Sequence, residues 1–388
     1  MEGLEDDVRR TLFNEDHEAF RETVRAFVER TIVPNHERFM EQRSIDREVW
    51  LEAGELGLLG LEIPEEYGGS GAHDFRFNVV VNEEFSKVAL AFASCMSIHA
   101  DICAPYLMKL TTEEQKKRWL PKFCTGEMWT AIAMTEPGGG SDLGALKTTA
   151  VRDGDTWVIN GSKTFITNGY SADFVIVAAR TDPAKGSKGI SLFAVESGTP
   201  GFERGRKLDK MGQHESDTAE LFFSDVRVPA DNMIGEEGTG FINMMKLLPQ
   251  ERLATAVTNL THATQIFTET LQYVKDRKAF GQPIGSFQHN AFQLADLSTR
   301  LDVTQAYVDK CIEFHVAGDM TTIDASKAKL WSSDIQNEVI DTCVQLHGGY
   351  GYMHEYRAAR AWADARVTKI WAGSNEIMKL IISRDLGL

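Results

Sequence analysis

Apolar residues recur at helical spacing through the first third of the chain. Between residues 16 and 33 they form one stripe that ends at Pro34, which predicts an opening helix. Further helical stretches are predicted at residues 47–56, 77–91, 94–110 and 112–119, the last with Thr112 as its N-cap. We therefore expect an all-helical domain over residues 1–127.

The pattern then changes to short runs of β-branched and aromatic residues, separated by Gly, Asp and Pro. These runs are residues 157–159, 174–177, 190–193 and 219–223. Strands that follow one another without intervening helices predict a small barrel or sandwich, which we place at residues 128–236.

Beyond residue 240 the strand signals end and long helical periodicity returns. One predicted helix has its apolar positions at Phe292, Ala295, Leu297, Leu301, Val308 and Cys311. We expect a four-helix bundle over residues 237–388. The expected fold class is α+β, with the β domain between two helical domains.

Composition and charge narrow the possible partners. Lys and Arg number 41 against 57 Asp and Glu, and this formal charge of −16 argues against nucleic acid and anionic lipid. Apolar runs are only a few residues long, far below the roughly 20 that span a bilayer, so we expect no membrane span. Residues 1–10 are acidic and lack an apolar stretch. We expect a cytoplasmic protein, or an organellar one that has lost a transit peptide.

The cysteines do not indicate disulfides or a zinc ribbon. Five cysteines are present without C-x-x-C spacing, so reduced thiols are expected. Cys343 and His347 stand four residues apart, as half a metal site would, but no second half is visible in the sequence. No metal is expected.

Four glycine-containing clusters are candidate ligand loops. They are residues 134–142 (MTEPGGGSD), 277–281 (RKAFG), 345–351 (QLHGGYG) and 371–376 (WAGSNE). Glycine lets backbone N–H groups approach phosphate or carbonyl oxygens closely. The first cluster lacks G-x-G-x-x-G spacing and no βαβ unit follows it, which excludes a dinucleotide fingerprint. On its own it fits a tight turn as well as a ligand loop.

Taken in order and at these spacings, the clusters resemble the acyl-CoA dehydrogenase family over nearly the whole chain. Residues 247–253 (LLPQERL) with 274–281 (VKDRKAFG) are most similar to the long-chain members. The resemblance implies an FAD enzyme that converts acyl-CoA to trans-2-enoyl-CoA in fatty-acid β-oxidation, on medium to long straight chains. It also implies a homotetramer, with an electron-transferring flavoprotein as oxidant.

The resemblance assigns cofactor contacts residue by residue. From the central domain it implies Met134, Thr135, Ser141, Phe165 and Thr167, with Phe165 where the family often has Trp. From a neighbouring subunit it implies Arg277, Phe280, Gln288, Gln345, Gly348 and Gly349, at the pyrophosphate and adenine end. Ser374 and Glu376 match further cofactor contacts of relatives.

The catalytic base is where this chain departs from many relatives. Many carry Glu directly before the Gly of the last cluster, where this chain has Ala372. A smaller group, including long-chain and isovaleryl-specific members, takes its carboxylate from the first long helix of the bundle, just before an Arg. Glu251 and Arg252 match that pattern. Partial burial beside flavin and acyl chain would raise the pKa of such a Glu toward neutral pH.

The remaining substrate contacts also follow from the resemblance. It implies that Arg252 and Ser141 bind CoA, that the Ala372 N–H polarises the thioester carbonyl, and that Gly373 lets the backbone lie against the thioester. Two alternatives stay open: an isovaleryl-type branched-chain dehydrogenase, and a catalytically silent paralogue, which the missing Glu at Ala372 would suggest. Chain length, and dehydrogenase as against oxidase behaviour, also stay open.

Overall fold

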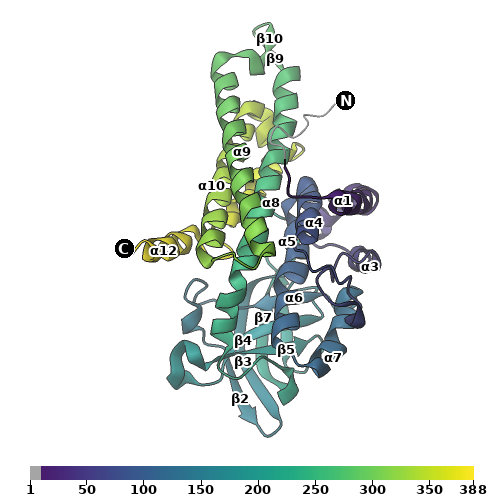
Figure 1. Ribbon diagram of the computed structural model, residues 1–388, viewed down its shortest axis with the longest axis vertical. Helices are drawn as coiled ribbons and strands as arrows, with labels where there is room; N and C mark the ends of the chain where they lie inside the picture. The colour runs from purple at the N-terminus through teal and green to yellow at the C-terminus, as the bar shows by residue number, and fades with distance from the viewer. Residues whose placement is uncertain (1–9) are drawn as a thin grey trace.

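The chain folds as a helical domain, a β-sheet and a helical bundle, in that order along the sequence (Figure 1). This arrangement confirms the predicted α+β fold class. The computed structural model describes residues 10–388. Residues 1–9, which carried most of the argument about a leader, lie outside the described part.

The amino-terminal domain is helical, as predicted. Its helices are α1 (Glu15–Phe27), α2 (His36–Gln42), α3 (Arg47–Glu55), α4 (Arg76–Val88), α5 (Leu90–Ser97), α6 (Ala104–Leu110) and α7 (Glu113–Cys124). Thr112 caps α7 as expected: its hydroxyl accepts a hydrogen bond from the Gln115 N–H, and the Gln115 side chain accepts one from the Thr112 N–H. This cap fixes the start of the last helix before the sheet.

One segment of this domain is apolar over the length of a bilayer. Leu90–Leu110, which runs through α5 and α6, is 21 residues long, and 83% of its most apolar window is buried inside the protein. The count of uninterrupted apolar residues had missed this segment. Its burial is the pattern of a core helix, because its apolar side chains contact protein on nearly all sides.

The central domain is built on β-strands. They are β1 (Thr130–Ala133), β2 (Thr149–Asp153), β3 (Thr156–Thr167), β4 (Phe174–Arg180), β5 (Ile190–Glu196), β6 (Phe202–Lys207), β7 (Thr218–Pro229) and β8 (Met233–Ile234). Within the described residues they form one eight-stranded sheet of order β6-β7-β3-β2-β4-β5-β8, with β1 parallel to β4. The strands that the sequence missed are β1, β2, β6 and β8, which are short or mostly polar.

The carboxy-terminal domain is dominated by three long helices. Its elements are α8 (Gly240–Asp276), β9 (Lys278–Ala279), β10 (Gln282–Pro283), α9 (Gln288–Val316), α10 (Thr322–His347), α11 (Arg357–Ala365) and α12 (Asn375–Asp385). At 1.5 Å per residue, α8 alone is about 55 Å long. It runs from the sheet to the small β9–β10 hairpin at the far end of the molecule (Figure 1).

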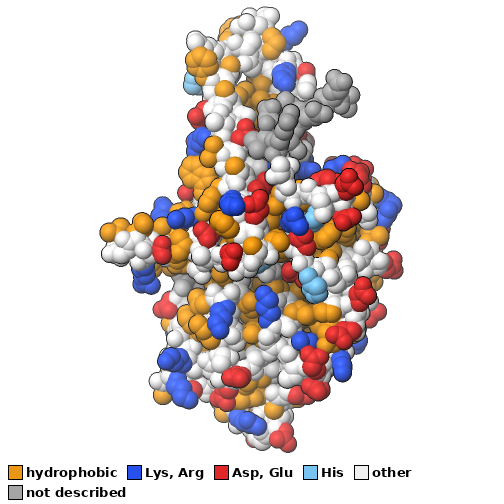
Figure 2. Space-filling view, in the orientation of Figure 1, with side chains coloured by type: hydrophobic (Ala, Val, Ile, Leu, Met, Phe, Trp, Pro, Cys, Tyr) orange, Lys and Arg blue, Asp and Glu red, His pale blue; other side chains and the backbone are white. Residues whose placement is uncertain are grey.

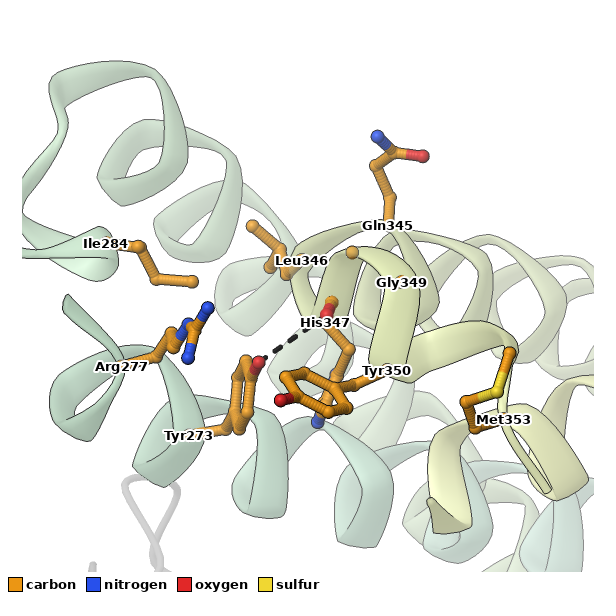
Figure 3. A pocket seen from close by; sticks show the side chains of 10 residues that line it. Tyr273, Arg277, Ile284, Gln345, Leu346, His347, Gly349, Tyr350 and Met353 are labelled. Carbon is orange, nitrogen blue, oxygen red and sulfur yellow. Dashed lines mark hydrogen bonds between the residues drawn. The ribbon is translucent and has the colours of Figure 1, made fainter. Parts of the chain in front are cut away.

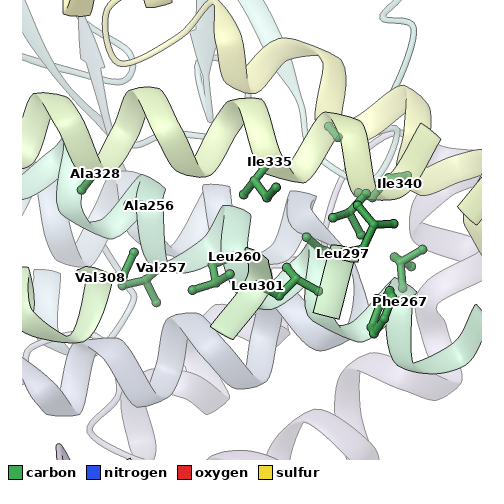
Figure 4. Packing of buried hydrophobic residues seen from close by; sticks show 14 of the residues in the cluster. Ala256, Val257, Leu260, Phe267, Leu297, Leu301, Val308, Ala328, Ile335 and Ile340 are labelled. Atoms are coloured by element: carbon green, nitrogen blue, oxygen red, sulfur yellow. The ribbon is translucent and has the colours of Figure 1, made fainter. Parts of the chain in front are cut away.

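The bundle core lies between α8, α9 and α10. Figure 4 shows Val257 and Leu260 of α8 packed with Leu301 of α9 and Ile335 of α10, and these four belong to one buried cluster. The predicted apolar stripe of α9 was wrong at Phe292 and Ala295, which are exposed. Those two positions lie on the outer face of α9, because a period of 3.6 residues places them away from Leu297 and Leu301.

Candidate active site

The predicted base lies on the part of α8 that is nearest the sheet. Its neighbour Gln250 donates a side-chain hydrogen bond to the Asp101 carbonyl at 2.9 Å, which ties this turn to the amino-terminal domain. The Glu251 side chain is half-buried. Burial raises the pKa of Glu251 to about 7, although the positive charges of Arg252 and Lys329 act in the opposite direction. A carboxylate with this pKa can take up a proton near neutral pH.

A sharply bent loop lies beside this carboxylate. Ala372 and Gly373 both have positive φ, +52° and +89°. The Ala372 carbonyl accepts a hydrogen bond from Arg252 Nε at 3.4 Å, and the Gly373 carbonyl accepts one from Lys329 Nζ at 2.7 Å. Among the described residues, the Ala372 N–H has no acceptor. Arg252 and Lys329 therefore hold the two carbonyls of this loop, and the Ala372 N–H is left without an acceptor.

Arg252 is buried rather than presented to solvent. Its side chain is only 4% exposed, and besides the Ala372 carbonyl it contacts the Ser326 hydroxyl at 3.3 Å. Burial lowers the pKa of Arg252, and the nearby Glu251 opposes this shift. Its role in CoA binding stays a prediction. What the structure adds is that Arg252 joins the helix of the base to the loop.

The first glycine cluster is fastened to the sheet by a buried ion pair. Lys163 Nζ on β3 lies 2.9 Å from Glu136 Oε1 and donates a further hydrogen bond to the Met134 carbonyl at 3.1 Å. The Glu136 carboxylate also accepts the N–H groups of Lys147 and Thr148. Burial acts to raise the pKa of Glu136, but these hydrogen bonds outweigh it and lower the pKa to about 2. The pair thus fixes residues 134–148 at both ends.

A β-bulge presents the predicted flavin-stacking residue. The pairing of β3 with β7 shifts register between Lys163 and Ile166, and Phe165 within the bulge has φ +59° and is 69% exposed. A bulge re-aims a side chain that would otherwise follow the strand alternation. The Thr164 N–H donates to the Thr135 carbonyl at 3.0 Å, so that the two segments predicted to contact flavin lie side by side.

The other central-domain contacts flank this surface. Met134, Thr135 and Thr167 are half-buried, and Ser141 is exposed. Gly138 and Gly139, between them in the loop, have no heavy atom within 4 Å of where a Cβ would stand. The structure therefore brings Met134, Thr135, Phe165 and Thr167 together as one open surface, with Ser141 at its edge.

A second group of predicted contacts lies at the opposite end of α8. Arg277, Gln345, Gly348 and Gly349 line a cavity of about 390 Å³ (Figure 3). The Tyr273 hydroxyl, which lines this cavity, donates a hydrogen bond to the His347 carbonyl, and His347 Nδ1–H donates one to the Cys343 carbonyl at 2.7 Å. His347 is therefore engaged in hydrogen bonds within the protein. The sequence had suggested it, together with Cys343, as half of a metal site.

Two further residues of this group lie next to the cavity. Phe280, in the β9–β10 hairpin, has φ +51° and is 96% exposed, and Gln288 begins α9. Because nearly the full length of α8 separates this end from the sheet, one chain does not bring the two groups of predicted cofactor contacts together. The structure is consistent in this respect with the expectation that a neighbouring subunit supplies the second group.

Ser374 and Glu376 lie where the active-site loop enters α12. The Ser374 hydroxyl caps this helix by accepting the Ile377 N–H at 3.4 Å. Glu376 stays in solvent, and hydrogen bonds from its own N–H and from Ser374 lower its pKa. Both residues are therefore close to Ala372 along the chain, and their contact with a cofactor stays a prediction.

Comparison with known proteins follows the same three-part division. The descriptions that match are acyl-CoA dehydrogenase N-terminal domain at residues 14–127, middle domain at 131–226 and C-terminal domain at 238–387. The chain belongs to the acyl-CoA dehydrogenase family. It is an FAD-dependent oxidoreductase, as members of this family are, and the predicted family, enzyme class and cofactor are confirmed.

Individual relatives in the family include enzymes named for different chain lengths. The mitochondrial long-chain specific acyl-CoA dehydrogenase of Sus scrofa is 46% identical, over 97% of this chain and 88% of the relative. The short-chain specific acyl-CoA dehydrogenase of Clostridium acetobutylicum is 39% identical, over 95% of this chain and 97% of the relative. A crystal structure of acyl-CoA dehydrogenase from Geobacillus kaustophilus superposes with a TM-score of 0.95 at 48% identity, over 97% and 99% of the two chains.

The residues present fit FAD. The distal cavity offers a guanidinium, Arg277, and two adjacent glycines without side-chain contacts, which suits a pyrophosphate. At the sheet, the projecting Phe165 ring offers an apolar face, and the bent loop keeps the Ala372 N–H unpaired. This chain thus has a candidate base on α8, an unpaired backbone donor in the loop held by Arg252, and a candidate cofactor surface on the sheet.

Three side chains that support the site were missed from the sequence. Glu136 stood in a recognised cluster without a role, and Lys163 and Lys329 were not singled out. The available signal was position: Lys163 falls on an inward-facing register of β3, and Lys329 falls between the buried Ala328 and Ser332 of α10. A lysine at an inward position has to find acceptors, because an unpaired buried charge is costly.

Proposed function

We propose that this acyl-CoA dehydrogenase acts on medium- to long-chain straight acyl-CoA thioesters and passes electrons to an electron-transferring flavoprotein. The observation that carries the proposal is the position of Glu251, half-buried with its pKa raised to about 7, beside a loop whose Ala372 N–H is unpaired. The loss of the carboxylate at Ala372 is thereby compensated. The silent-paralogue alternative loses its main support.

The chain's own residues would divide the reaction between them. Glu251 removes the α-proton of the thioester, and the Ala372 N–H donates a hydrogen bond to the thioester oxygen, on which negative charge develops. FAD, when bound, supplies the acceptor for the β-hydrogen and its electron pair. A carbon–carbon double bond forms between Cα and Cβ, and the proton stays on Oε of Glu251 until it exchanges with water.

A second copy of the chain would complete the cofactor site. Phe280 and Tyr352 are 96% and 85% exposed, and Leu386 and Leu388, which follow α12, are exposed as well. In Figure 1 α12 protrudes from the body of the protein, and Figure 2 shows hydrophobic side chains on this protrusion. Large exposed apolar side chains in such numbers are typical of protein interfaces. We therefore propose a homotetramer in which each distal end serves the sheet of a neighbour.

An anaerobic absorption titration with palmitoyl-CoA tests the function. We expect the flavin band to bleach, the Glu251→Gln variant to stay yellow and unreduced, and the exposed-site control Glu114→Gln to behave as wild type. A bleach by isovaleryl-CoA alone would replace the straight-chain proposal with the branched-chain one. Protein that folds but retains no flavin would refute the proposal, as would turnover by Glu251→Gln.

A further inference from the structure

Two lysines are fully buried in the described part of the chain, and they differ in how their charge is balanced. Lys163 has the Glu136 carboxylate at 2.9 Å. Lys329 on α10 has no carboxylate within 4 Å among the described residues, and its Nζ donates to the Gly373 carbonyl at 2.7 Å and to Asn375 Oδ1 at 2.9 Å. Burying an ammonium on neutral acceptors alone is costly.

Those two acceptors belong to the active-site loop. Gly373 carries one of the two left-handed backbone conformations there, and a Cβ at this position would stand 2.7 Å from Met378 Cε. Asn375 is itself fastened to α10, since its amide donates to Ser333 Oγ at 3.0 Å and to Asp334 Oδ1 at 3.1 Å. The ammonium group is thus the donor that holds the Gly373 carbonyl.

We propose that Lys329 is a positioning residue for the dehydrogenation: it holds the loop so that the Ala372 N–H meets the thioester oxygen, and its charge favours the ionised form of Glu251. This inference rests on the proposed function. The ammonium charge of Lys329, which no carboxylate pairs within 4 Å among the described residues, then acts on the nearby Glu251 carboxylate.

The titration of the surrounding groups supports this assignment. Burial and the neighbouring Arg252 lower the pKa of Lys329 to about 8, while Asp334, Glu376 and Glu251 act to raise it. The pKa of Glu251 is raised to about 7 by burial, and Lys329 and Arg252 oppose that rise. Glu251 is thus ionised, and Lys329 charged, together only in the interval between these two values.

The other groups that face the pair do not change charge in this interval. From α6 and the turn before it, Tyr106 and Cys103 have pKa values raised by burial, so both stay neutral. Asp334 is paired with Lys369 at 2.9 Å. The pKa of Glu376 is lowered, so Glu376 stays ionised in this interval. Lys329 is therefore the neighbour whose deprotonation slows the reaction on the alkaline side.

Two substitutions and a matched control separate the charge from the packing. Lys329→Met removes the charge and keeps most of the volume, and Lys329→Arg keeps a charge that does not titrate below about pH 12. The control is Lys210→Met, which removes a half-buried lysine whose Nζ donates to the Ser216 carbonyl at 2.7 Å, in the loop before β7.

The rate of anaerobic flavin reduction by the acyl-CoA that bleaches the wild type is measured against pH in the holoenzymes. For the wild type we expect a bell with limbs near pH 7 and pH 8. Lys329→Met corresponds to wild type with Lys329 deprotonated, so we expect a reduced maximal rate, no alkaline limb, and an acid limb about one unit higher, which is about tenfold less Glu251 carboxylate below both pKa values. In Lys329→Arg the acid limb stays and the alkaline limb is lost. Lys210→Met keeps both limbs.

A second readout does not depend on turnover. The carboxylic C=O stretch of protonated Glu251, isolated as the infrared difference between each protein and its Glu251→Gln counterpart, is titrated with pH. We expect its midpoint in Lys329→Met to lie about one unit above wild type. Unchanged acid limb and unchanged midpoint overturn the proposal. If Lys329→Met does not fold, an alkaline limb retained by Lys329→Arg overturns it instead.

These outcomes are distinguishable from failure of the proposed function. If no acyl-CoA bleaches the wild-type flavin, the dehydrogenation proposal fails, and the infrared midpoint still decides whether Lys329 acts on Glu251. If the wild type bleaches and the Lys329 variants lose rate equally at every pH, the function stands and the charge-coupling inference is overturned.

Discussion

Replacing Glu251 should make the folded protein relatively more stable at alkaline pH, because the buried and unpaired Glu251 carboxylate destabilises the folded state when it is ionised. The pKa of Glu251 rises from its ordinary value of 4.5 to about 7 on folding, chiefly through burial. A group with a raised folded-state pKa contributes stability that is complete below its unfolded pKa and is lost as pH rises through its folded pKa. The window of the loss therefore lies between about pH 4.5 and pH 7.

The magnitude follows from the size of the shift. At about 1.4 kcal/mol per pKa unit, the full loss is about 3.4 kcal/mol, of which about 2.5 kcal/mol falls between pH 5 and pH 8. Glu251→Gln keeps the shape and has no ionisation to suppress. Relative to wild type, the variant should therefore gain about 2.5 kcal/mol in unfolding free energy between these two pH values.

Denaturant unfolding at one fixed protein concentration, with both proteins at both pH values, measures this difference. Taking the difference between variants cancels the other titrating groups. Glu114→Gln, on the exposed face of α7, is the control and should give no pH-dependent difference. If the unfolding free energies of wild type and Glu251→Gln change in parallel from pH 5 to pH 8, the pKa of the Glu251 carboxyl is not raised. The argument for Glu251 as the base then fails.

Three further predictions concern groups around the site. Glu136→Gln leaves the buried Lys163 ammonium without its carboxylate, so it should cost about 3–5 kcal/mol of stability and release flavin, seen as a lower melting temperature and a colourless eluate. Tyr106→Phe removes a buried hydroxyl that has no hydrogen-bond partner within the described residues, so the unliganded protein should gain about 1 kcal/mol in a denaturant titration. Gly373→Ala places a Cβ against Met378 at a φ of +89°, so flavin reduction should slow at least tenfold while flavin absorbance shows that the cofactor is retained.

The architecture was predictable because each domain has its own hydrophobic period. Alternating β-rich runs interrupt two helical regions, and Thr112 with Gln115 is a local capping signal that needs no tertiary context. The α9 stripe was less predictable at Phe292 and Ala295. An apolar residue on an outer face looks the same in sequence as one in the core, and only the packing of neighbouring helices separates them.

A candidate site could be assigned from the sequence where its residues resemble a family, but the tertiary contacts that support those residues could not. The bulge that projects Phe165 arises from a register shift between β3 and β7, which no local motif encodes. The hydrogen bonds of Lys329 join α10 to a loop 44 residues later in the chain. Such contacts are set by tertiary packing, so periodicity and capping signals do not reveal them.

The two alternative positions for the base are connected through Arg252. This residue follows Glu251 on α8, and its Nε donates to the carbonyl of Ala372, the position at which many relatives carry their Glu. The helix that carries Glu251 and the loop at residue 372 therefore lie next to each other. Moving the base from loop to helix leaves the backbone donor of residue 372 in place, since an N–H does not depend on the side chain. With Glu251 as the proposed base, the departure from the commoner pattern changes which element carries the carboxylate and keeps the backbone donor of residue 372.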